Sequence, residues 1–193
     1  VFAKEVFFYC ANPKCPAKIK AHLAYFVARD ALNIEGLGNK LINRLVDLNR
    51  LKTPADLYSL TVDELASLDR MGQKSASKII AEIEKSKNTT LSRFIFALGI
   101  KNVGEKTATD LAEHFKTFQN IKNASIDALL EIEDIGEIVA QSIVDFFENK
   151  ENNRWIDELF SYGFTFKNEV AKNNSGVLNG KSFVLTGSLS KPR

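Results

Sequence analysis

The chain has 193 residues, of which 45% are hydrophobic, and its formal net charge is +2. That length suits one ordinary domain or two small ones with a buried core, and two cysteines cannot form a disulfide framework, which fits a reducing compartment such as the cytoplasm. No apolar run approaches the roughly 20 residues of a membrane span, no charged-then-apolar leader opens the chain, and the net charge is too small to indicate a partner.

The N-terminal segment carries half of a metal site. We expect the first 17 residues to be extended and loop-like, and within them four residues separate Cys10 from Cys15. A tetrahedral zinc site needs four ligands. The chain has no further cysteine, and its only histidines are His22 and His114. His22 shares a helical stretch with apolar neighbours, so we expect it to be packed or at the surface. Cys10 and Cys15 are therefore candidate metal ligands or, alternatively, simple reduced thiols.

Short helices are predicted over most of the remaining chain, and strand signals appear only at its two ends. Apolar residues at helical spacing begin at Ile19 and predict further helices over 73–85, 105–115, 137–147 and 153–162. Thr61 to Glu64 reads as a capping box at a helix start. Six phenylalanines fall at helical positions and are predicted to be core residues rather than base-stacking platforms: Phe94, Phe96, Phe115, Phe118, Phe146 and Phe147.

The most informative feature is a repeat of about 32 residues. Glycines that open predicted helices are separated by 34, 32 and 32 residues: Gly38, Gly72, Gly104 and Gly136. The residue before each glycine is apolar: Leu37, Met71, Val103 and Ile135. Residues that pack on one helical face follow at offsets of four and seven: Ile42, Ala76, Ala108 and Ala140, then Leu45, Ile79, Leu111 and Ile143. Each unit is therefore predicted to be a helix, a tight turn and a second helix.

This unit resembles the helix-hairpin-helix motif, whose turn is usually glycine, hydrophobic residue, glycine. Gly36-Leu37-Gly38 matches fully, whereas the later copies replace the first glycine by Arg70, Asn102 and Asp134. Four copies in register predict a mainly α fold. We expect a tandem bundle of four helix-hairpin-helix motifs, similar to SAM-like domains and to the second domain of RuvA.

Such a turn suits a phosphate group. A glycine lets the backbone approach a ligand closely, and the helix that follows offers unpaired N–H groups and the positive end of its dipole. A lysine stands two residues after three of the glycines, and nothing in such a site reads a base edge. The predicted DNA-binding residues are Gly36, Gly38, Lys40, Arg70, Gly72, Lys74, Asn102, Gly104 and Lys106.

The fourth turn differs from the other three. Acidic residues surround it, and Ile138 replaces the lysine: the acids are Glu131, Glu133, Asp134 and Glu137. Like charges repel a phosphate, so we expect this hairpin to be structural or only weakly engaged.

Two other functions fit the same repeat. The glycines can be ordinary helix caps of a helical protein-interaction domain, or the hairpins can form a self-standing DNA-binding module of a repair or recombination protein. Three lysines at matched offsets favour DNA over the first alternative.

The two ends of the chain favour a third context. The tail LNGKSFVLTGSLSKPR resembles the first strand of a BRCT domain, and the polar stretch NEVAKNNSG precedes it. Together with CANPKCPAKI, RDALNIEGLG and FALGIKNVGEKTA, the tail resembles the C-terminal part of bacterial-type NAD-dependent DNA ligases. The resemblance implies a zinc-finger remnant at 1–18, the helix-hairpin-helix DNA-binding domain at 19–167, a linker at 168–177 and the start of a truncated BRCT domain at 178–193.

The resemblance also implies a function. The parent enzyme would use NAD, Mg²⁺ and Zn²⁺ to seal nicks in DNA replication and repair, and this part would bind nicked double-stranded DNA without sequence preference. Cys10 and Cys15 match the second cysteine pair of the family's zinc finger, with the first pair expected upstream. The chain has no Lys-x-Asp-Gly motif and hence no adenylated lysine. We therefore assign no catalytic residue and expect this chain to be inactive alone. We also expect it to be cytoplasmic and monomeric, and to bind no cofactor other than zinc.

Overall fold

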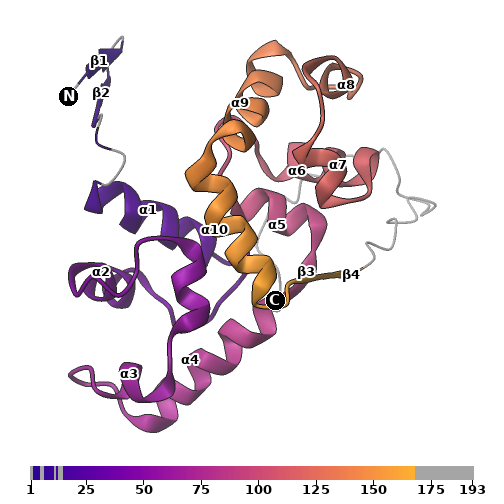
Figure 1. Ribbon diagram of the computed structural model, residues 1–193. Helices are drawn as coiled ribbons and strands as arrows, with labels where there is room; N and C mark the ends of the chain where they lie inside the picture. The colour runs from indigo at the N-terminus through magenta and orange to yellow at the C-terminus, as the bar shows by residue number, and fades with distance from the viewer. Residues whose placement is uncertain (1, 5–6, 11, 13–14, 168–193) are drawn as a thin grey trace, which may run out of the picture.

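The computed structural model describes residues 2–4, 7–10, 12 and 15–167, so the linker and the BRCT-like tail predicted from the sequence lie outside the described residues. The described part is mainly helical, as predicted, with a small antiparallel β-hairpin at its N-terminal end. This hairpin pairs β1 (Phe2–Lys4) with β2 (Phe7–Tyr9) and projects from the helical body, as Figure 1 shows. Within the described residues, none of the helices has the length and apolar character that crossing a membrane would require.

The first half of the helical body contains two helical hairpins. The first packs α1 (Pro16–Phe26) against α2 (Asn39–Asp47). A 3-10 helix, η1 (Pro54–Ser59), leads to the second, in which α3 (Val62–Ala66) packs against α4 (Gln73–Ser86).

The second half repeats this arrangement. Its first hairpin packs α5 against α6, its second packs α8 against α9, and α10 returns to contact η1 in the first half. Figure 1 shows α10 running between the two halves. The bounds are Leu91–Ala97 for α5, Glu105–Phe115 for α6, Phe118–Lys122 for α7, Ile126–Leu130 for α8, Glu137–Glu148 for α9 and Lys150–Ser161 for α10.

The expectation that strands occur only at the two ends of the chain is wrong. In the middle of the chain, β3 (Asn88–Thr90) pairs in parallel with β4 (Thr165–Lys167). Both strands are three residues long, too short to show an alternating apolar pattern. Their pairing depends on packing between segments far apart in sequence, so local residue preferences do not reveal it.

The core confirms the periodic pattern. Residues four positions after each turn glycine are 0% exposed, namely Ile42, Ala76, Ala108 and Ala140. Those seven positions after are 0–5% exposed, namely Leu45, Ile79, Leu111 and Ile143. Each second helix therefore presents its predicted face to one continuous hydrophobic core.

Packed aromatic rings connect α5, at the start of the second half, with α10 and β4 at its end. Phe94 on α5 is 0% exposed, and its ring lies 5.2–5.6 Å, between centroids, from four others: Phe118, Phe160, Phe164 and Phe166. The predicted core phenylalanines are confirmed. Three of the six are buried and the other three pack partly exposed against the core.

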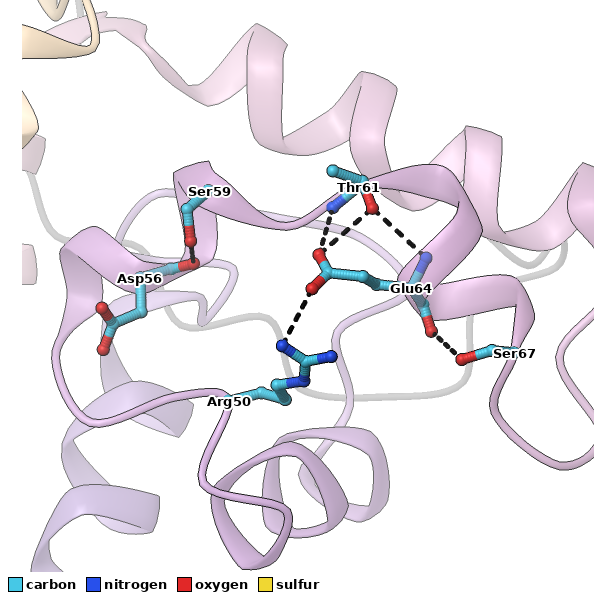
Figure 2. A network of polar contacts seen from close by, with 6 residues as sticks. All are labelled: Arg50, Asp56, Ser59, Thr61, Glu64 and Ser67. Atoms are coloured by element: carbon cyan, nitrogen blue, oxygen red, sulfur yellow. Dashed lines mark hydrogen bonds and ion pairs between the residues drawn. The ribbon is translucent and has the colours of Figure 1, made fainter.

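Local capping explains where several helices begin. Thr61 and Glu64 form the predicted capping box at α3, and Arg50, in the loop after α2, makes an ion pair of 3.1 Å with Glu64 that ties the first hairpin to the second (Figure 2). Helix α10 starts at Lys150, earlier than predicted, because Asn149 Oδ1 accepts hydrogen bonds from the backbone N–H groups of Glu151 and Asn152.

Candidate nucleic-acid interface

The four hairpin turns share one backbone geometry. Their first positions all lie in the left-handed region, with φ of 90° at Gly36, 62° at Arg70, 63° at Asn102 and 69° at Asp134. Non-glycine residues tolerate φ near 60°, and asparagine and aspartate are enriched there. Replacing the first glycine therefore keeps the left-handed first position, which all four predicted copies share.

The apolar residue in the middle of each turn anchors it to the core. Leu37, Val103 and Ile135 are 3–6% exposed, and Met71 packs partly exposed against the core. In the last three turns this residue's N–H donates to the carbonyl three residues earlier, at 3.0–3.1 Å: Met71 to Leu68, Val103 to Ile100, and Ile135 to Ile132. The turns are therefore fixed from beneath, whereas their outer sides are open.

The second glycine of each turn lies at the N-cap of the following helix. Its φ is between −74° and −92° in all four cases, which any residue can adopt: Gly38, Gly72, Gly104 and Gly136. A Cβ built at any of these positions meets no heavy atom within 4 Å. The packing of this chain therefore does not require glycine there, and the free space allows an external group to reach the backbone.

The amides after these glycines have no side-chain cap. Helices α2, α4, α6 and α9 all begin on glycine without a side-chain hydrogen bond. By contrast, five other helices have a capping side chain: Thr61, Thr90, Thr117, Ser125 and Asn149. The first amides of a helix carry partial positive charge, so the four hairpin turns offer uncapped donors for an anion.

All nine residues predicted to bind DNA are exposed: Gly36, Gly38, Lys40, Arg70, Gly72, Lys74, Asn102, Gly104 and Lys106. The turns are thus accessible rather than occluded inside the bundle. The contact of these residues with nucleic acid stays a prediction.

The turns are held in two neighbouring pairs. In the first half, the space where a Cβ would stand on Gly36 is filled by Ile79 of α4, and Arg44 Nη1 donates to the carbonyl of Asp69 at 2.9 Å. In the second half, Asn102 Nδ2 donates to Ser142 Oγ of α9 at 3.1 Å. Each pair therefore behaves as one packed unit.

The three lysines differ in their surroundings. Within the described part of the chain, Lys40 and Lys74 have no carboxylate partner at salt-bridge distance, whereas Lys106 forms an ion pair with Asp134 of the fourth turn. Asp134 accepts a hydrogen bond from Lys106 and attracts its charge, with smaller contributions from Asp110 and Glu133, and this raises the pKa of the Lys106 ammonium group. Reading the sequence missed this pair. The signal was present, because Asp134 occupies the repeat position of Asn102 in the neighbouring turn.

The fourth turn is acidic and carries an exposed aliphatic residue. Ile138 is 76% exposed where the other turns have lysine, and Glu131, Glu133, Asp134 and Glu137 are exposed. The prediction that this hairpin engages DNA weakly is consistent with its surface charge.

The two cysteines fit half of a zinc site. Cys15 lies at the N-cap of α1, and hydrogen bonds from the backbone N–H groups of Lys18 and Ala17 and from Cys10 lower the pKa of its thiol, which favours the thiolate form that binds metal. Among the described residues, no cluster of three or more His, Cys, Asp and Glu side chains is placed to hold a metal ion. Within the described part of the chain His22 belongs to no such cluster, and its Nε2 lies 3.1 Å from the Leu98 carbonyl oxygen.

Paired hairpins with open, uncapped glycine turns define a tandem helix-hairpin-helix protein. Comparison with known families agrees: residues 28–85 match the SAM-like helix-hairpin-helix tandem, and residues 93–156 match the helix-hairpin-helix motif. Curated relatives narrow the assignment. The chain is 43% identical to a DNA ligase of Methylacidiphilum infernorum over 188 aligned residues, and this alignment covers 97% of the chain. It is 45% identical to a DNA ligase of Anoxybacillus flavithermus, also over 188 residues, and that alignment covers 96% of the chain. The chain belongs to the helix-hairpin-helix region of the bacterial DNA ligase family.

The chain corresponds to only part of these relatives. It spans 27% of the length of the Methylacidiphilum infernorum protein and 28% of the Anoxybacillus flavithermus protein. A DNA ligase of Bacillus cytotoxicus is 50% identical over 100 residues, which cover 52% of the chain and 15% of that protein.

Proposed function

We propose that this chain is the part of an NAD-dependent DNA ligase that binds duplex DNA without sequence preference and holds a nick for sealing. The observation that carries this proposal is the set of four exposed, uncapped glycine turns, each fixed to the core by a buried or partly buried apolar residue. Such turns suit the phosphate backbone, which every DNA sequence presents in the same way.

Each turn is suited to one or two phosphates. A phosphate oxygen can accept from the amides that follow Gly38 or Gly72, and Lys40 or Lys74 adds a positive charge two residues further on. Because these contacts involve backbone amides and flexible ammonium groups, they discriminate poorly between base pairs. We expect the first three turns to supply most of the affinity.

The parent enzyme performs the chemistry in this proposal. It would use NAD and Mg²⁺, while this chain, which lacks a Lys-x-Asp-Gly motif, would be inactive alone. Its contribution would be placement, because holding two strand ends in register lowers the entropic cost of joining them. We further propose that the enzyme acts in replication and repair, in the cytoplasm, as a monomer.

Zinc binding forms a second part of the proposal. Cys10 and Cys15 would supply two thiolate ligands, with two more from a cysteine pair elsewhere in the parent protein. Zinc would then fix the segment that precedes α1, since structural zinc sites contribute folding free energy directly.

A salt titration of DNA binding tests the proposal. Fluorescence anisotropy of labelled duplexes, both nicked and intact and in several unrelated sequences, would be measured between 50 and 200 mM salt. If three hairpins neutralise one or two phosphates each, log K should fall with log salt at a slope of about −3 to −5, with micromolar or weaker affinity at physiological salt. Salt-independent binding, strong preference for one sequence or absence of binding would contradict it, and absence would favour the protein-interaction alternative.

A further inference from the structure

We propose that Asp134 of the fourth turn competes with DNA phosphate for Lys106 of the third turn. The carboxylate thereby moderates the affinity of the turn beside it. This inference rests on the proposed function, because it concerns the same phosphate-binding surface.

The geometry of the ion pair places the competition at the surface. Lys106 stands two residues after Gly104, on the first turn of α6, and its ammonium group contacts Asp134 Oδ2. The two side chains are 73% and 65% exposed, so neither is held in place by burial. A phosphate that approaches the amides after Gly104 therefore meets a lysine whose charge already faces a carboxylate.

The arrangement is specific to this pair of turns. Asp134 occupies the left-handed first position of its turn, where the other three turns have Gly36, Arg70 and Asn102. The first two turns have no acid at this position, and within the described residues Lys40 and Lys74 have no carboxylate at salt-bridge distance. The hydrogen bond from Asn102 to Ser142 holds the third turn beside α9, so the ion pair forms between segments already packed together.

The competition is expected to be moderate. Exposed ion pairs contribute little free energy, so releasing Lys106 from Asp134 should change DNA affinity by about two- to fivefold. Asp110 and Glu133 add to the negative potential around Lys106, which remains protonated in either arrangement. The third turn thus binds phosphate less strongly than its sequence alone indicates.

Asp134→Asn is the direct test, since asparagine tolerates the left-handed backbone at this position and removes the negative charge with little change in side-chain size. Glu131→Gln is the matched control, because it removes the same charge from the same acidic segment and Glu131 makes no ion pair within the described part of the chain. Affinity for a 20-base-pair duplex at 50 mM salt would be measured for both variants, and for each again in a Lys106→Ala background.

We expect Asp134→Asn to bind duplex about two- to fivefold more tightly than the wild-type chain, and more tightly than Glu131→Gln. In the Lys106→Ala background the gain should shrink to that of the control. A gain equal to that of Glu131→Gln in both backgrounds would show a general charge effect, and weaker binding would show that Asp134 positions Lys106; either result overturns the inference. Absence of DNA binding by every protein, wild type included, would instead overturn the proposed function and this inference together.

Discussion

At the scale of single residues, the two glycines of the first turn differ in what the fold requires of them. Gly36 has φ of 90°, and a Cβ there would stand 2.8 Å from Ile79 Cγ1. The fold itself therefore requires glycine at this position. Gly38, two residues later, has an ordinary φ of −74° and open space around it, so the fold does not require glycine there.

Gly36→Ala should therefore destabilise the chain by about 2–4 kcal/mol, because backbone strain adds to overpacking against Ile79. Gly163→Ala is the matched control. Gly163 has a similar φ of 89° but no neighbour within 4 Å, so strain alone should cost about 1–2 kcal/mol. Urea denaturation of both variants measures the difference, and equal losses would contradict the packing argument.

His22 should make stability depend on pH. Burial lowers the pKa of its imidazole below the ordinary value of 6.5, although the hydrogen bond with the Leu98 carbonyl opposes this shift. The folded state then binds the proton more weakly than the unfolded chain. The free energy of unfolding is therefore at its full value above pH 6.5, where His22 is neutral in both states. It decreases as the pH falls below 6.5, because the unfolded chain then takes up the proton more readily than the folded chain.

Denaturation at pH 7.5 and 5.5 tests this prediction. From pH 7.5 to pH 5.5, titration of His22 should lower the free energy of unfolding by at most about 1.4 kcal/mol. His22→Gln should reduce the pH dependence, whereas the same change at exposed His114 should leave it as in the wild type. An unchanged pH profile in His22→Gln would show that the imidazole does not carry the effect.

At the scale of elements, the sequence predicted most of the helical repeat. The spacing of glycine and apolar residues located α4, α6 and α9 within one residue of their observed ends, because each helix has one buried face and a clear start signal. It did not predict β3 and β4, which depend on contacts between distant segments. The candidate turns were found from their glycines, but the Lys106–Asp134 pair depends on how two hairpins pack together.

Helix α5 provides the element-scale prediction. Phe94→Ala should destabilise the chain by about 3–5 kcal/mol, because it removes a fully buried ring that contacts side chains of α7, α10 and β4. Leu48→Ala, at a position 52% exposed, should change stability by less than about 0.5 kcal/mol. Chemical denaturation measures the free energy of unfolding of both variants. A similar, small decrease in the two would mean that α5 is not central to the core.

At the scale of the whole molecule, contacts across the two halves hold the hairpin pairs in one body. Helix α10 contacts η1, and the Tyr58 ring on η1 packs edge-on to Phe164 from the far end of the chain. Within the first half, the Tyr58 hydroxyl lies 2.8 Å from Ser86 Oγ on α4. Burial raises the pKa of Tyr58 well above its ordinary value, so the hydroxyl stays protonated. In the proposed function, turns held on one body would contact the phosphate backbone at several points together, and such multivalent binding raises the affinity above that of a single turn.

The open glycine turns are proposed to bind DNA phosphate, and valine substitution tests this binding most directly. Gly38→Val, Gly72→Val and Gly104→Val would each be compared with Gly136→Val by fluorescence anisotropy on one nicked duplex, after circular dichroism and denaturation confirm folding. All four substitutions place a side chain in open space at a helix N-cap, so any effect on the helix start is shared. We expect about tenfold weaker binding for each of the first three variants, because hydrogen bonds to a charged phosphate are lost, and little change for Gly136→Val. Unchanged affinity in Gly38→Val and Gly104→Val would contradict it.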